Sequence, residues 1–341
     1  MKPRAFAALF LLLPVFAFFE VQSPSPIRGT WTVEEGCSKA IEIQADFRTA
    51  LGQHSHTLKV MRADIKPGAT QGTVQFAVAR AAGTFNFTGT LADDDQGSGQ
   101  VQFTANPQFP NDMAALGYTH LSSDDVFRMA MVDVTPQFAR DLNEAGYPNL
   151  ATEELIRMRI HDADAEFIRA LAQVGVKGLQ AEELIRMRIH DATPDFIQQM
   201  QAAGFNGVAP EELIRMKIHD VTPEFVQQMK QLGYAQTDPE ALIRFKIHDV
   251  DAEFISAVRK LGFTSIEADE LVRMKIHDVT PDFISKVKQL GYNDVDPDEL
   301  IRLRIHDVSP EYIAQAKSYQ SDITLDEIIN HKVRGDRITH M

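Results

Sequence analysis

Cysteine is almost absent from the sequence, because Cys37 is the only one among 341 residues. A single thiol cannot form a disulfide within the chain, and it excludes metal sites built from several cysteines. The stability of the fold must therefore come from packing. Cys37 itself is expected to be a small buried residue near a strand, with pairing between two chains as the alternative.

Positive charge is also scarce. The chain has 34 Lys and Arg residues against 48 Asp and Glu residues, which gives a formal net charge of −14. Nucleic-acid binding depends on clustered Lys and Arg side chains that neutralise phosphates. This composition therefore predicts that nucleic acid is not a partner.

Long hydrophobic runs are confined to the N-terminus. Lys2 and Arg4 precede an apolar block over residues 5–19, and Glu20 and the stretch SPSP follow it. The block is shorter than the ~20 residues of a spanning helix, so residues 1–22 are interpreted as a secretory signal, with an uncleaved N-terminal anchor as the alternative. Apart from such an anchor we expect no stable membrane insertion. The predicted location is the periplasm or the cell surface.

Short catalytic motifs are missing as well. The sequence contains no H-E-x-x-H, no G-x-S-x-G and no phosphate loop. These motifs place a metal, a nucleophile or a nucleotide in a defined structural setting. We therefore expect no catalytic residue, no metal, no cofactor and no enzymatic activity.

Residues 27–105 show alternating hydrophobicity. The stretches TWTV, HTLKV, GTVQFAVA and GTFNFTGTL place apolar residues at every second position, and Gly-rich or Asp-rich segments separate such stretches. This pattern predicts a small antiparallel β domain of about five or six strands with one buried face. Its expected core residues are large and apolar: Trp31, Phe76, Phe85, Phe87 and Phe103.

His54 and His56 lie in the segment LGQHSHT, which we interpret as a polar linker of this domain. An H-x-H pair can hold a metal ion, but no third ligand is close in the sequence, so a solvated linker is the preferred interpretation. A hydrolase sited in the β domain would have to depend on these two histidines.

A repeat of fixed length replaces the alternation after residue 105. The stretch ELIRMRIHDATPDF recurs with small changes, and its histidine stands at positions 161, 190, 219, 248, 277 and 306, an interval of 29 residues. Val132-Asp133 occupies the same slot in an earlier, altered copy. Because such periods are typical of stacked supersecondary units, we predict an α-helical solenoid of about seven repeats over residues 106–319. A capping helix and tail are expected over residues 320–341.

Each repeat divides into two short helices. The first, as in residues 210–219, opens with Pro and Glu and is expected to bury Leu213, Ile214, Met216 and Ile218. The second begins at the N-cap residue Thr222, has Pro223 at its first position, and ends at Gly233 in the left-handed conformation. The cap position of other repeats holds equivalent residues: Asp164, Thr193, Asp251, Thr280 and Ser309.

The repeated His-Asp pair can be interpreted as a reactive motif, as a ladder of metal ligands, or as a joint between two helices. A metal needs three or four ligands around one ion, whereas equivalent stacked helices lie ~8–10 Å apart. An active site is normally singular, and this pair is copied in every repeat. We therefore predict a structural ladder at the helix ends, formed by His161, His190, His219, His248, His277 and His306.

A row of arginines is the candidate partner-binding site of the repeats. Its members are Arg157, Arg186, Arg215, Arg244, Arg273 and Arg302. The alternative is a solvated face in which each arginine pairs with the glutamate one turn earlier on the same helix. Solenoids bind along repeated surfaces, so an extended acidic or peptide ligand would suit such a row.

The repeat ELIRMKIHDVTPEFVQQMKQLGY and the preceding AGTFNFTGTL and GSGQVQFTANPQF segments resemble an extracytoplasmic region of soil-bacterial proteins. That region occurs as a tail on some antirepressor-type zinc metallopeptidase sensors, the family that includes beta-lactam signal transducers, and in free-standing proteins. The likeness covers residues 29–319. The peptidase domain with its H-E-x-x-H is absent, so no peptidase residue is carried over. The resemblance implies an exported sensory or interaction module.

The sequence as a whole predicts an α+β protein with segregated elements, a small antiparallel β domain followed by an α-solenoid of two-helix repeats. The expected function is non-catalytic recognition of a protein or peptide partner, with envelope sensing as its setting. A self-associating structural component of the envelope, which would be a homo-oligomer, is the main alternative. A hydrolase sited in the β domain is a further alternative.

Overall fold

The computed structural model describes residues 26–36, 39–49, 52–68, 72–92, 96–234 and 238–335. The expected signal or anchor segment and Cys37 lie outside these ranges. The chain divides into two compact units, with the boundary between Pro136 and Gln137. Within the described ranges, no helix combines the length and the apolar character that a membrane span requires.

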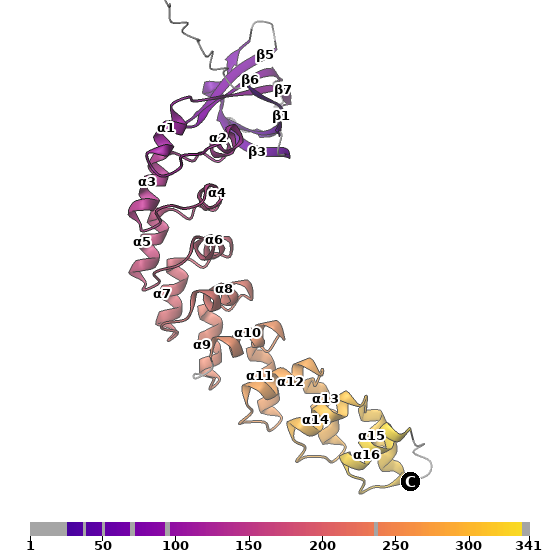
Figure 1. The fold of residues 1–341 in the computed structure, drawn as a ribbon. Helices are drawn as coiled ribbons and strands as arrows, with labels where there is room; N and C mark the ends of the chain where they lie inside the picture. Colours follow the sequence, from indigo (N-terminus) through magenta and orange to yellow (C-terminus); the bar gives the residue numbers. More distant parts are fainter. Residues whose placement is uncertain are drawn as a thin grey trace, which may run out of the picture. The chain divides into compact units, whose positions relative to one another are not determined.

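The first unit is built on one antiparallel sheet, which has seven strands in the described residues (Figure 1). The strand order is β3-β2-β1-β7-β6-β5-β4, so β1 and β7 are the neighbours that are distant in sequence. The predicted β domain is therefore present, with more strands than the alternation suggested. The strands are β1 (Ile27–Gly36), β2 (Ala40–Thr49), β3 (Gly52–Met61), β4 (Lys66–Pro67), β5 (Thr73–Arg80), β6 (Gly83–Leu91) and β7 (Gly97–Ala105), with the 3-10 helix η1 (Arg62–Asp64) after β3.

The aromatic residues predicted for the core of the sheet are all buried. Trp31 is 1% exposed, and its indole ring meets Phe76 and Phe87 edge-on, with ring centroids 5.4 and 6.5 Å apart. Its ring nitrogen donates to the Thr88 carbonyl at 3.1 Å, which satisfies the polar group of a buried side chain. A Cβ at Gly99 would lie only 2.7 Å from the Trp31 ring nitrogen, so the indole depends on that glycine for space.

Two helices complete the first unit, α1 (Phe109–Ala114) and α2 (Ser123–Met131). Phe127 of α2 is fully buried, and its ring centroid lies 5.0 Å from that of Phe47 and 5.4 Å from that of Phe103. Helix α2 is therefore packed into the aromatic core of the sheet. This explains why the compact unit extends beyond residue 105 to Pro136.

His54 and His56 lie in strand β3, so their assignment to a linker was wrong. In the β2–β3 pairing, His54 stands opposite Phe47 and His56 opposite Ala45. The His54 ring also lies 5.6 Å from the ring of Phe127. The sequence LGQHSHT has little apolar content, and the strand forms because the preceding strand and the aromatic core supply its partners.

The second unit consists of short helices in a two-helix repeat, as predicted (Figure 1). The helices of the chain from the unit boundary onward are α3 (Pro136–Glu144), α4 (Thr152–Ile160), α5 (Ala165–Gln173), α6 (Ala181–Ile189), α7 (Pro194–Ala202), α8 (Pro210–Ile218), α9 (Pro223–Gln231), α10 (Pro239–Ile247), α11 (Ala252–Lys260), α12 (Ala268–Ile276), α13 (Pro281–Gln289), α14 (Pro297–Ile305), α15 (Pro310–Tyr319) and α16 (Leu325–Arg334).

Equivalent helices of successive repeats contact one another. Figure 1 shows α4, α6 and α8 following one another along one side, with α5 and α7 along the other, and the same contacts continue through α10, α12, α14 and α16. The predicted N-caps are in place: the Thr222 hydroxyl accepts the Phe225 N–H at 3.2 Å, and the other five cap residues make the same bond. This stacking is the predicted α-solenoid.

The prediction that Ile218 faces the core was wrong. Leu213, Ile214 and Met216 are buried as expected, but Ile218 is 47% exposed. Ile218 is the last residue of α8 and directly precedes the C-cap residue His219. Its spacing of four from the buried Ile214 continues the apolar stripe, but this end of the helix is not covered.

Candidate functional site

The Ile-His-Asp stretch of each repeat ends the first helix. In the repeat of α8, His219 is the C-cap residue and Asp220 has a left-handed φ of 54°. The Asp220 N–H donates to the Lys217 carbonyl at 3.1 Å, and the Val221 N–H donates to the Met216 carbonyl at 2.8 Å. This pair of hydrogen bonds is the Schellman motif. The same positive φ recurs at Asp133, Asp162, Asp191, Asp249, Asp278 and Asp307.

Aspartate occupies a position that is usually glycine in helices that end in the left-handed conformation. A short polar side chain tolerates the left-handed region better than other L residues do. The second helix of the repeat ends in the same conformation, but there the residue is glycine, as predicted for Gly233 with its φ of 87°. The chain therefore turns twice per repeat with two different left-handed residues.

The six histidines of the predicted ladder are the C-cap residues of the first helices, and all are half-buried. The backbone N–H of each histidine donates to the arginine carbonyl four residues earlier, as His219 does to Arg215 at 3.0 Å. In the described part of the chain, no group of three His, Cys, Asp or Glu side chains gathers within reach of a metal ion.

The arginine row bridges successive first helices. Arg215 donates from both terminal nitrogens to the carboxylate of Glu240 in the next repeat, at 2.5 and 3.1 Å. A two-bond contact of this kind orients both side chains. Spacing on one helix favoured the glutamate one turn earlier, whereas the structure pairs each arginine with an acid of the following repeat: Arg157–Glu182, Arg186–Glu211, Arg244–Asp269, Arg273–Asp298 and Arg302–Asp326.

Two adjacent acids open most first helices, and they have different roles. Glu211 receives the arginine of the preceding repeat, while Glu212 accepts the backbone N–H of the N-cap residue Ala209 at 3.3 Å. In α10 the second acid is missing, and Asp238 caps the helix instead by accepting the Ala241 N–H at 2.7 Å. The two adjacent acidic residues in the sequence are therefore the signal that could have predicted an ion pair between successive repeats.

These ion pairs are exposed to solvent. Their hydrogen bonds still change the pKa of the carboxyl groups. The bonds from Arg157 hold the pKa of the Glu182 carboxyl below its ordinary value. The Arg215 side chain remains 36% exposed while it is paired, and that of Arg273 remains 47% exposed. A partner that contacts this row would therefore meet arginines whose charge is already paired with a carboxylate.

A second cationic row, two residues later, faces the preceding repeat. The Lys246 ammonium lies 5.1 Å from the centroid of the Phe225 ring and 3.1 Å from the Asp220 carboxylate. Such a contact combines a cation–π interaction with an ion pair. The other ring contacts of this kind are Arg159–Phe138, Arg188–Phe167, Lys217–Phe196, Lys275–Phe254, Arg304–Phe283 and Lys332–Tyr312.

An exposed isoleucine precedes the histidine in each repeat. The row consists of Ile160, Ile189, Ile218, Ile247, Ile276 and Ile305, which are 51, 48, 47, 46, 51 and 53% exposed. They are six of the nine large apolar side chains that stand exposed in the described residues. Scattered exposed apolar residues are ordinary, but these six recur at the same position of successive stacked repeats. We call this set the isoleucine row.

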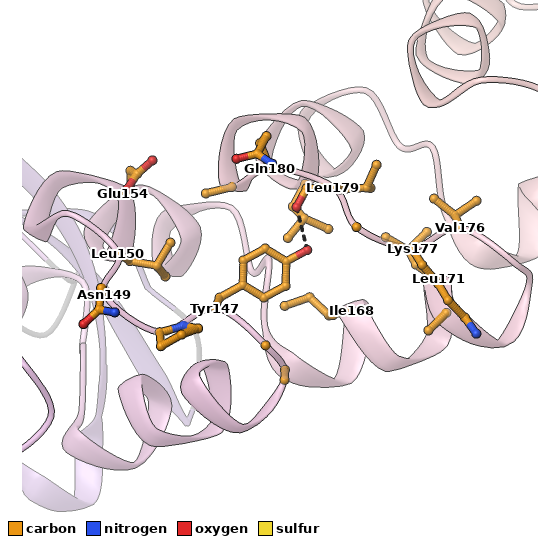
Figure 2. A pocket seen from close by; sticks show the side chains of 17 residues that line it. Tyr147, Asn149, Leu150, Glu154, Ile168, Leu171, Val176, Lys177, Leu179 and Gln180 are labelled. Atoms are coloured by element: carbon orange, nitrogen blue, oxygen red, sulfur yellow. Dashed lines mark hydrogen bonds between the residues drawn. The ribbon is translucent and has the colours of Figure 1, made fainter.

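Grooves lie between the loops that follow the second helices. Figure 2 shows one of about 680 Å³, in which the ring of Tyr147 crosses towards the next repeat. The Tyr147 hydroxyl donates to the Leu179 carbonyl at 2.8 Å, and burial raises the pKa of Tyr147. A second pocket of about 450 Å³ lies one repeat further on, and Val176 lines both.

Comparisons with protein-family models, with curated proteins and with solved structures find no match to this chain. The predicted arginines and histidines do not converge on one centre but run along the array in parallel rows. The isoleucine row was missed because its spacing from Ile214 matched that of a buried stripe.

Proposed function

We propose that this chain is a non-catalytic, exported repeat protein that recognises a protein or peptide partner along its stacked first helices. The observation that carries the proposal is the isoleucine row, which leaves about half of each side chain in water at the same position of six repeats. The apolar N-terminal block and the resemblance to extracytoplasmic sensor tails support an exported protein with a role in envelope sensing.

The spacing of the row suits an extended partner. Stacked helices lie ~8–10 Å apart. A polyproline II segment has three residues per turn and rises ~3.1 Å per residue, so side chains on one face recur every ~9 Å. A partner with an apolar residue at every third position would therefore place one side chain on each successive isoleucine.

The ion-paired arginines supply the polar part of the surface. Ile218 follows Arg215 by three residues, and residues at that spacing are neighbours on a helix. Each isoleucine therefore stands beside an arginine that already bridges to an acid of the next repeat, such as Glu240. The pairs present both charges to the partner's backbone and polar side chains, while the isoleucines supply the apolar contact.

Display selection with peptides of the pattern apolar-x-x, followed by fluorescence anisotropy, tests the proposal. The double variant Ile218→Gln, Ile247→Gln is expected to weaken binding by about tenfold or more, because full burial of one such side chain is worth ~1.5–3 kcal/mol and these are half-exposed in the free protein. The matched control is Gln198→Ala with Gln227→Ala, which changes exposed positions on second helices.

Selection that enriches no periodic peptide, or equal affinity of the isoleucine variant and the control, would contradict the proposal. Sedimentation equilibrium at several protein concentrations distinguishes partner recognition from the main alternative, self-association. If the row mediates self-association, the mass of the wild-type protein will rise with concentration without any peptide, and the double variant will stay monomeric.

A further inference from the structure

A single asparagine of the chain is followed by glycine. The sequence has eight asparagines, and only Asn206 precedes a glycine, Gly207. Both residues lie in the loop between α7 and α8, which joins the two sides of the array (Figure 1), and both are exposed to solvent. In any asparagine, the backbone nitrogen of the following residue can close a ring with the carbon of the side-chain amide. The structure around residues 206 and 207 decides whether that reaction is open here.

The Gly207 nitrogen is sterically accessible. Apart from the neighbouring residues of the chain, no heavy atom would lie within 4 Å of a Cβ placed on Gly207. This residue has a left-handed φ of 70°, which glycine adopts without strain. In the described part of the chain, no residue accepts a hydrogen bond from the Gly207 N–H or bonds to the Asn206 side chain. No contact of the folded loop therefore holds the nitrogen and the amide apart.

We propose that Asn206 is a site of spontaneous deamidation. The Gly207 nitrogen attacks Cγ of Asn206 and forms a nitrogen–carbon bond. The bond from Cγ to Nδ2 breaks, and ammonia leaves with the proton of the Gly207 N–H. Water then opens the resulting succinimide ring at either carbonyl. Opening at Cγ gives aspartate, and opening at the backbone carbonyl gives isoaspartate, in which the main chain runs through the former side chain.

An equivalent loop of the array contains a matched residue. Asn293 stands three intervals of 29 residues after Asn206, in the loop between α13 and α14, and it is exposed as well. The residue after it is Asp294, whose φ is not positive. Asp294 brings a Cβ and a carboxylate next to its own nitrogen, and the negative charge opposes loss of the amide proton. Asn293 should therefore react far more slowly than Asn206.

The chain on both sides of the reactive pair is held by hydrogen bonds. The Phe205 N–H donates to the Met200 carbonyl at 2.9 Å, and the Ala209 N–H donates to the Glu212 carboxylate at 3.3 Å. Isoaspartate adds a carbon to the main chain between these two bonds. It also adds a negative charge to a chain whose formal net charge is −14. The modification therefore falls on the connection between two repeats and involves no member of the isoleucine row.

Incubation of the purified full chain in warm, mildly alkaline buffer, followed by tryptic peptide mapping, tests the proposal. Trypsin places Asn206 and Asn293 in separate peptides, residues 189–215 and 289–302, and neither peptide has another asparagine. The first peptide should gain the mass difference between a hydroxyl and an amino group, with aspartate and isoaspartate located at residue 206 by fragment ions. The second peptide should stay unchanged. The folded chain should react within about tenfold of the isolated peptide 189–215, because one restraining hydrogen bond would slow it by roughly that factor.

Two variants provide the controls, and far-ultraviolet circular dichroism checks that each is folded. Asp294→Gly recreates the asparagine–glycine pair and should make Asn293 react, whereas Asn206→Gln should remove the reaction from the first peptide. The proposal would be overturned by an unmodified Asn206, by equal conversion of Asn206 and Asn293 in the wild-type chain, by an inert Asn293 in Asp294→Gly, or by a folded chain more than about tenfold slower than the peptide. None of these outcomes depends on the isoleucine row, so the two proposals fail separately.

Discussion

Replacing Asp220 by alanine is expected to destabilise the helical unit by about 1 kcal/mol more than replacing it by glycine. Asp220 has a φ of 54°, and its N–H closes the Schellman motif of α8. A Cβ in the left-handed region costs ~1–2 kcal/mol. Glycine avoids that strain but loses ~0.5–1 kcal/mol through the greater freedom of its unfolded chain, which leaves a difference of about 1 kcal/mol.

The comparison of the two variants isolates the backbone effect. Both substitutions remove the carboxylate that contacts the Lys246 ammonium at 3.1 Å, and this pair lies at the surface, where ion pairs contribute ~0–1 kcal/mol. The loss of the pair is common to alanine and glycine and cancels between them. The remaining difference reports the conformation of residue 220.

Urea unfolding followed by far-ultraviolet circular dichroism measures the difference. Fluorescence of Trp31, which is the only tryptophan and lies in the first unit, serves as an internal control because its transition should not move. Equal midpoints for the alanine and glycine variants would refute the claim that a left-handed residue is what ends the first helix.

Two further perturbations test the caps and the sheet. Thr222→Ala removes the acceptor of the Phe225 N–H and should lower the unfolding free energy by about 0.5–2 kcal/mol, whereas Thr222→Asp should retain most of it, as measured by urea unfolding. Burial, and secondarily the charge of Arg80, lower the pKa of His56 in the folded protein. The folded state therefore binds this proton less tightly than the unfolded state does, so the stability of the first unit should fall as the pH drops below about 6.5. Tryptophan-detected urea midpoints at several pH values should show this fall in the wild-type protein; its persistence in His56→Gln would assign it to another group.

Much of the helical unit could be predicted from its sequence because its signals are local. The cap at Thr222, the proline at position 223 and the left-handed Gly233 act within a few residues of where they stand. The 29-residue period then implied stacking, because a single hairpin cannot bury its own apolar face. The core of the sheet could also be predicted, because large residues such as Trp31 and Phe87 alternate with polar ones.

The misplaced residues share a different cause. Ile218 follows the buried Ile214 by four residues, which is the spacing of a buried helix face. Its exposure depends instead on which parts of the helix surface the neighbouring repeats cover. His54 and His56 form a strand because β2 supplies a partner along the whole segment. The partner of Arg215 is an acid of the next repeat, and spacing on one helix cannot show it.

The sequence by itself determined the two periods, the helix ends and the count of repeats, because dihedral preferences and capping bonds involve residues close together in the chain. Tertiary structure alone decided which polar side chains bridge the repeats and which isoleucines remain in water. Those outcomes depend on contacts between residues about 25 to 32 positions apart, whose geometry is set only when one repeat is stacked on the next.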